Sequence, residues 1–164
     1  MAVRLLLLLL VPAIALAQPE EQDVSVQSSK VSCTSGPYRV KLPKTYKGLR
    51  RMAVLKREKV LDESDYGTFR ELRFVGLELV VLTKPGRPND YQLARAFFTT
   101  SKWRIMGPLR VGAPARLALK GLPVSPMPRF GSVTLEGDAD SVLLTVSGGR
   151  LQEIEYECAT DEGK

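Results

Sequence analysis

The chain has 164 residues, a net charge of +6, two cysteines and no histidine. The absence of histidine excludes Ser-His-Asp and Cys-His catalysis and imidazole zinc sites, and it removes the side chain that most often acts as a general base at neutral pH. Catalysis by paired carboxylates or by a Ser-Lys pair, and binding of calcium, remain open.

The first 17 residues have the three parts of a secretory signal peptide. Arg4 supplies the positive charge, residues 5–11 form the apolar core, and Ala15-Leu16-Ala17 provides the small residues before a cleavage site. An uncleaved membrane anchor is the alternative, but the apolar run is shorter than the ~20 residues that a spanning helix needs, and Pro12 interrupts it. We therefore expect cleavage after Ala17 and no transmembrane segment in the mature protein.

The composition of the exported chain indicates its compartment. The chain is rich in Leu, Val, Arg, Ala and Gly, and Asn89 is its only asparagine, which is typical of a GC-rich bacterial genome. We expect the bacterial periplasm, with secretion into the medium as the alternative.

The mature chain has the size of one domain. Removing the signal peptide leaves about 147 residues, enough to bury a core. Residues 18–30 are polar and acidic without hydrophobic periodicity, which predicts a mobile tail. A single domain is then expected over residues 31–160, followed by a C-terminal tail over residues 161–164.

Cys33 and Cys158 are expected to form a disulfide bond, because an even number of cysteines in an exported protein most simply pairs. The bond would close a loop of about 125 residues, and on the chain-entropy model such a loop contributes about 5 kcal/mol. The alternative is a reactive or metal-binding thiol, but neither a neighbouring cysteine nor a histidine is present to support one.

Basic side chains are concentrated in residues 39–59, which we call the basic segment. Against Glu58 alone it holds nine cations: Arg39, Lys41, Lys44, Lys47, Arg50, Arg51, Lys56, Arg57 and Lys59. Residues 131–164 have the opposite balance, with eight acidic residues against two basic ones. Outside the cytoplasm the basic segment would attract phospholipid or lipopolysaccharide head groups, cell-wall polymers or acidic proteins rather than nucleic acid. The alternative is a solvated face that lies near the acidic C-terminal strand.

The basic segment overlaps two short elements. Tyr38, Val40 and Leu42 alternate with charged residues and predict a strand that Pro43 ends. Residues 45–62 fit both a helical face and the beginning of a strand, so their secondary structure stays open.

The rest of the chain is richer in strands than in helices. Alternating apolar residues between Gly-rich and Pro-rich turns predict strands over residues 69–75, 77–83, 91–99, 131–136, 141–147 and 150–158. Val75 is expected to point at least partly inward. A short helix is predicted over residues 110–123, ending at Gly121. The expected fold is α+β: one domain with an antiparallel sheet of about five to seven strands and one or two short helices packed on one face.

Two acidic groups could carry chemistry. Glu136, Asp138 and Asp140 resemble half of a calcium loop, but no glutamate closes it, and a polar turn explains them better. Glu153, Glu155 and Glu157 would lie ~7 Å apart on one strand face, a separation that glycoside hydrolysis could use. Three acids on one strand are more typical of a solvated or edge-protecting face.

Trp103 has two interpretations. With Phe97, Phe98 and Ile105 around it in the sequence, it fits packing at the core or its rim better than a platform for a sugar ring.

Residues 109–156 predict a helix followed by a hairpin, and short motifs mark the ends of these elements. The motifs are Arg110-Val111-Gly112, Lys120-Gly121-Leu122-Pro123, Ser147-Gly148-Gly149-Arg150 and Glu153-Ile154-Glu155-Tyr156. This order resembles small bacterial envelope domains of the beta-lactamase-inhibitor-protein and outer-membrane-assembly-lipoprotein type. Two residues depart from that pattern. Ala113 stands where a Ser, Thr or Asp would cap the helix, and Gly121 precedes Leu122 instead of following it. The resemblance implies a helix packed with an antiparallel sheet and a noncatalytic role, and it carries over no functional residue.

These observations favour a noncatalytic periplasmic protein without a cofactor or metal, which binds another envelope component through the basic segment. A second hypothesis is an inhibitor of an extracytoplasmic enzyme, which would use an acidic or aromatic edge, such as the strand from Glu153 to Glu157, against a basic hydrolase. A hydrolase that uses carboxylates alone is the third.

Overall fold

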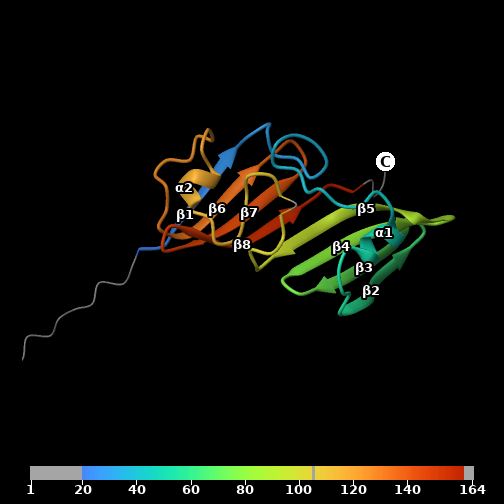
Figure 1. Ribbon diagram of the computed structural model, residues 1–164. Helices are drawn as coiled ribbons and strands as arrows, with labels where there is room; N and C mark the ends of the chain where they lie inside the picture. The colour runs from blue at the N-terminus through green and yellow to red at the C-terminus, as the bar shows by residue number, and fades with distance from the viewer. Residues whose placement is uncertain (1–19, 105, 161–164) are drawn as a thin grey trace, which may run out of the picture.

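The computed structural model describes residues 20–104 and 106–160, and its eight strands form one sheet (Figure 1). The strands are β1 (Gln22–Gln27), β2 (Arg57–Ser64), β3 (Gly67–Phe74), β4 (Leu77–Lys84), β5 (Arg87–Phe98), β6 (Phe130–Glu136), β7 (Ser141–Ser147) and β8 (Arg150–Glu157). Their order in the sheet is β1-β6-β7-β8-β5-β4-β3-β2. The predicted signal peptide and C-terminal tail lie outside the described residues.

The sheet consists of two halves that meet where β5 pairs with β8. One half holds β1, β6, β7 and β8, and the other holds β2 to β5. Only four residue pairs join them, from Arg95 opposite Glu157 to Phe98 opposite Ile154. Figure 1 shows the consequence: the molecule is elongated, with α1 beside one half and α2 beside the other.

Local alternation explains β3 to β8, which confirm the six predicted strands. In β7 and β8 the side chains of Val142, Leu144, Ile154 and Tyr156 are fully buried, and more exposed residues alternate with them. Burial of one face along each strand removes apolar surface from water, which is the main stabilising term of the sheet. One cluster of buried side chains runs through both halves.

The fold is mainly β, which corrects the predicted α+β class and the predicted number of strands. Helix α1 (Tyr46–Arg51) has six residues and α2 (Ala115–Ala118) has four, so neither is long enough to form a helical layer on one face of the sheet. The helix predicted over residues 110–123 is thus reduced to about one turn. Gly112 and Gly121 have φ angles of +85° and +87°, outside the right-handed helical region, and they limit it on both sides.

Strand β1 lies within the segment that the sequence predicted as a mobile tail. It pairs in parallel with β6, from Gln22 opposite Gly131 to Gln27 opposite Glu136. Val26 is buried on the side that faces the core. A parallel partner more than a hundred residues away leaves no hairpin signal in the sequence, although Val24 and Val26 do alternate with polar residues.

The strand predicted over Tyr38 to Leu42 is absent, and this part of the described chain is a loop. Tyr38 and Val40 are nevertheless buried in the core. The Val40 amide donates to the Cys33 carbonyl at 3.1 Å, so this loop is held by its own turn rather than by the sheet.

The predicted disulfide is confirmed, and it lies at the junction of the two halves. The sulfur atoms of Cys33 and Cys158 are at bonding distance, and their Cα atoms are 5.8 Å apart. Beside it, the Cys158 amide donates to the Ala94 carbonyl of β5 at 2.8 Å. The bond therefore fastens the loop between β1 and α1 to the point where β8 meets β5.

Asp140, in the turn between β6 and β7, holds both of the chain segments that carry the disulfide cysteines. Its two carboxylate oxygens accept hydrogen bonds from the Cys33 amide at 2.7 Å and from the Ala159 amide at 2.9 Å. The cluster of Asp140 with both sulfur atoms spans less than 4.8 Å, but sulfur atoms in a disulfide lack the thiolate that binds a metal.

No helix among the described residues combines the length and the apolar character needed to span a membrane.

The role of Asp140 can be tested with the disulfide intact. Asp140→Ala removes a charged acceptor from two backbone amides, and we expect a loss of about 2 kcal/mol in the free energy of unfolding, measured by urea denaturation. Asp138→Ala is the control, because Asp138 is exposed in the same turn. Equal stability of the two variants would contradict the bracing role.

Candidate functional site

The structure resolves the basic segment into a loop, helix α1 and the beginning of β2. All nine of its Lys and Arg side chains are exposed. Lys47, Arg50 and Arg51 lie on α1, whereas Arg57 and Lys59 lie on β2. The segment that sequence patterns left open, residues 45–62, therefore holds both a helix and a strand.

Helix α1 forms because it is capped and anchored. The Thr45 hydroxyl oxygen accepts the Gly48 amide at 3.1 Å, as in an N-cap. Tyr46 and Leu49 are buried against the sheet, so the cationic residues of the helix are left outside. Arg50 and Arg51 lie in the last turn, where positive charge is favourable for the helix dipole.

Glu58, the only acid of the basic segment, ties α1 to the sheet. The Tyr46 hydroxyl donates to its Oε1 atom at 2.8 Å, and Arg50 Nε lies 2.8 Å from its Oε2 atom. Arg70 Nη1 of β3 approaches Oε1 at 3.7 Å. Burial, together with the hydrogen bond to the Glu58 carboxylate, raises the pKa of Tyr46 above its ordinary value. This carboxylate is thus shared among three partners.

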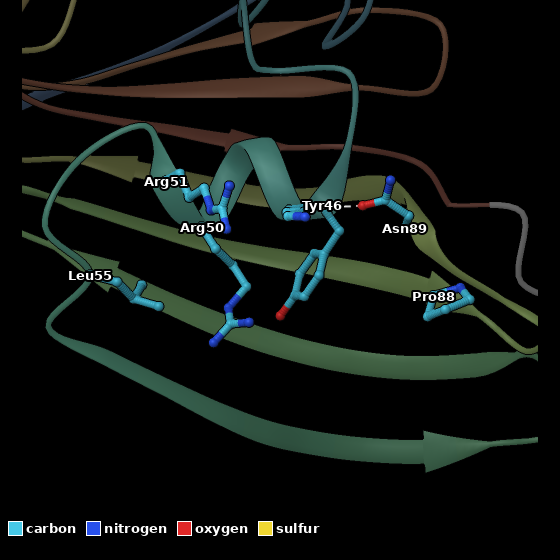
Figure 2. Close-up of a pocket in the computed structure, with 7 residues that line it drawn as sticks. Tyr46, Arg50, Arg51, Leu55, Pro88 and Asn89 are labelled. Carbon is cyan, nitrogen blue, oxygen red and sulfur yellow. Dashed lines mark hydrogen bonds between the residues drawn. The ribbon is translucent and has the colours of Figure 1, made fainter.

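A cavity of about 590 Å³ lies beside α1. It is lined by Tyr46, Lys47, Arg50, Arg51, Leu55, Pro88 and Asn89. Figure 2 shows the Tyr46 and Arg50 side chains extending from the helix between Leu55 and Pro88. The Lys47 amide donates to Asn89 Oδ1 at 3.0 Å, which fixes the helix to the beginning of β5. The cavity thus combines cationic groups with an apolar wall, which suits an anion that carries an apolar part.

The acids of β8 lie far from the β2 part of the basic segment. Three strands separate β2 from β8, which at about 4.8 Å per step places the two strands roughly 19 Å apart. Charges in water are largely screened beyond about 8 Å at physiological ionic strength. The alternative interpretation placed the basic segment near the acidic C-terminal strand. For the β2 part of the segment, the structure does not show this arrangement.

The acids of β8 lie on the exposed face of a strand at the middle of the sheet, so they do not protect an edge. Glu155 forms an ion pair with Arg95 of β5. The Arg95 guanidinium also lies 5.9 Å from the centre of the Phe97 ring. Glu153 and Glu157 are exposed. The structure thus gives these three carboxylates different surroundings.

The acidic turn after β6 lines a hollow of about 440 Å³. The Asp140 carboxylate accepts hydrogen bonds from backbone amides beside the disulfide. The Glu136 carboxylate accepts hydrogen bonds from the Ser25 hydroxyl, at 2.7 Å, and from the side-chain amide of Gln27. These carboxylates therefore join β1, β6 and the disulfide loop, as structural turn residues do.

A second group of surface residues was not predicted from the sequence to lie together. Ala53, Val54, Val75, Lys102 and Trp103 line a hollow of about 300 Å³, which we call the apolar hollow. Val75 was expected to point inward, but it lies in the turn after β3 and its exposed fraction is 54%. The members come from three separate segments, so no local pattern could reveal the group.

Trp103 packs at the rim of the core, as one of its two interpretations proposed. Its ring meets the Phe74 ring edge-on, with centroids 5.9 Å apart. Its indole N–H donates to the Val75 carbonyl at 3.0 Å. The side chain is only partly buried, so one side of the ring also borders the apolar hollow.

The chain has no match among protein-family models, curated proteins or solved structures. The resemblance of residues 109–156 to small envelope domains accordingly stays an expectation.

Tyr91 fastens the loop that carries the first cations of the basic segment. Its hydroxyl donates to the Pro43 carbonyl, next to Lys44. Burial raises the pKa of Tyr91 from 10.0 to about 12. The folded state therefore holds this proton more tightly than the unfolded chain. Its contribution to stability is complete below pH 10 and is lost as the pH rises through about 12.

We expect the free energy of unfolding to fall between pH 10 and pH 12, and to fall less steeply in Tyr91→Phe, which has no phenol at this position. Urea unfolding across this range measures both slopes. Burial also raises the pKa of Tyr38 and Tyr156, so a residual slope should remain in the variant. Identical slopes for the two proteins would contradict this assignment.

Proposed function

We propose that this chain is a noncatalytic, exported periplasmic protein that binds an anionic component of the cell envelope through the basic segment, Arg39 to Lys59. One observation carries the proposal. Among the described residues, Arg50 is the only one of the nine cations of this segment that forms an ion pair within the protein. The other eight are exposed and available to an outside partner.

The arrangement of these cations favours a surface as the partner. Arg51 is the last residue of α1, and only four residues separate it from Lys56. The Lys56 amide donates to the Arg73 carbonyl at 2.8 Å, which fixes its backbone to β3. Cations held on an ordered backbone lose little entropy on binding, so their attraction to an anionic surface is largely retained.

Salt and charge removal test the proposal together. Lys47, Arg51 and Lys56 can be changed to Gln without disturbing the pair between Arg50 and Glu58. At about 1 kcal/mol for each cation near an anionic membrane, we expect binding to phosphatidylglycerol vesicles to weaken on the order of 100-fold. Retention of the original protein on these vesicles and on immobilised heparin should also fall steeply with added salt. Vesicle sedimentation and salt elution measure the two effects.

A matched control removes the same charge elsewhere. Arg116, Lys120 and Arg129 are exposed in the other half of the molecule, and their triple Gln variant should bind almost as well as the original protein. Equal losses in the two triple variants would indicate a response to net charge alone. That outcome, or retention that does not depend on salt, would reject the basic segment as the binding surface.

A further inference from the structure

The connection between α1 and β2 carries an exposed apolar tip. Met52-Ala53-Val54-Leu55 is bracketed by Arg50-Arg51 on one side and Lys56-Arg57 on the other. Met52 and Leu55 pack partly against the core, whereas Ala53 and Val54 are exposed. Val54 is 74% exposed, although a valine gains most by burial. An apolar residue held in water between four cations has no role in the core of this chain.

Two further elements extend the tip into a surface. Val75 is 54% exposed, and together with Val54 and Trp103 it lines the apolar hollow. Trp103 is fixed there by its edge-on contact with Phe74. The hollow is therefore a firm apolar surface, not a set of scattered side chains.

The indole nitrogen of Trp103, a polar atom of this surface, already has a hydrogen-bond partner within the protein. The indole N–H of Trp103 donates to the Val75 carbonyl at 3.0 Å. Moving an unpaired donor out of water costs free energy, but a donor with an internal partner avoids most of that cost. Trp103 can thus enter an apolar medium without leaving its N–H unbonded.

Cations lie at the hollow and on both sides of the tip. Lys102 lines it, and Arg51 and Lys56 flank the tip; all three are exposed. Long basic side chains can lay their aliphatic stems along apolar surface while their charged ends stay at the level of polar groups. This pattern complements a surface that is anionic outside and apolar just beneath.

We propose that Val54, Val75 and Trp103 insert into the boundary between head groups and acyl chains of an anionic bilayer, while Arg51, Lys56 and Lys102 contact its phosphates. This inference rests on the proposed function and narrows the partner to anionic lipid. A soluble polyanion would use the cations but gains nothing from the apolar residues. A bilayer uses both.

The chain contains one tryptophan, so Trp103 reports its own environment. The exported protein, purified after removal of the signal peptide, is mixed with phosphatidylglycerol vesicles or with heparin. Emission of Trp103 should shift to shorter wavelength and be quenched by lipids brominated near the top of the acyl chains. Heparin should bind without this shift.

Val54→Ser removes apolar surface without changing charge. Because Val54 is exposed, we expect the variant to fold like the original protein. We expect vesicle affinity to fall about fivefold and heparin affinity to stay the same. Leu117→Ser is the matched control, because Leu117 is 69% exposed on α2 in the other half of the molecule. Thermal unfolding of both variants verifies that they are folded.

The outcomes separate this inference from the proposed function. If salt-sensitive binding is retained but Trp103 emission does not shift, or Val54→Ser behaves like Leu117→Ser, the insertion is overturned and the basic surface stands. If the triple variant of Lys47, Arg51 and Lys56 binds like the original protein, the proposed function fails.

Discussion

The junction between β5 and β8 is the constraint on which the rest of the structure depends. Four residue pairs join the two halves of the sheet, and the bond between Cys33 and Cys158 lies at the same place. A short pairing of this kind contributes little by itself, whereas on the chain-entropy model a disulfide that closes so long a loop contributes about 5 kcal/mol. Asp140 adds its carboxylate to the same point. The elongated molecule is thus braced at its centre.

The order of the sheet also places the acids of β8 away from the cations of β2. The chain leaves β1 at one edge of the sheet, crosses beside the disulfide, and reaches α1 and β2 in the other half (Figure 1). The acidic strand β8 lies in the first half, beyond the screening length from β2. The second half also holds acids: Asp62 and Glu63 lie on β2, and Glu58 holds Tyr46 and Arg50. Among the described residues, the other eight cations of the basic segment form no ion pair within the protein.

Local patterns predicted β3 to β8 well, because turns bound their apolar residues and, in β7 and β8, buried residues alternate with more exposed ones. Other elements were beyond such patterns. β1 depends on a distant parallel partner, and α1 has only six residues, too few to establish a helical period. The segment from Tyr38 to Leu42 was predicted as a strand, and Tyr38 and Val40 are buried as in a strand. Within the described part of the chain the segment pairs with no strand, because its hydrogen bond to Cys33 holds it in the disulfide loop.

The sequence by itself determined the paired cysteines, the density of positive charge in residues 39–59 and the absence of histidine chemistry, because these are properties of residue type and local spacing. Only the tertiary structure decided that the acids of β8 lie far from Arg57 and Lys59 of β2, that Asp140 braces the disulfide, and that Val54, Val75 and Trp103 share one hollow. Those relations join residues that are far apart in the chain, and strand pairing, not local propensity, brings them together.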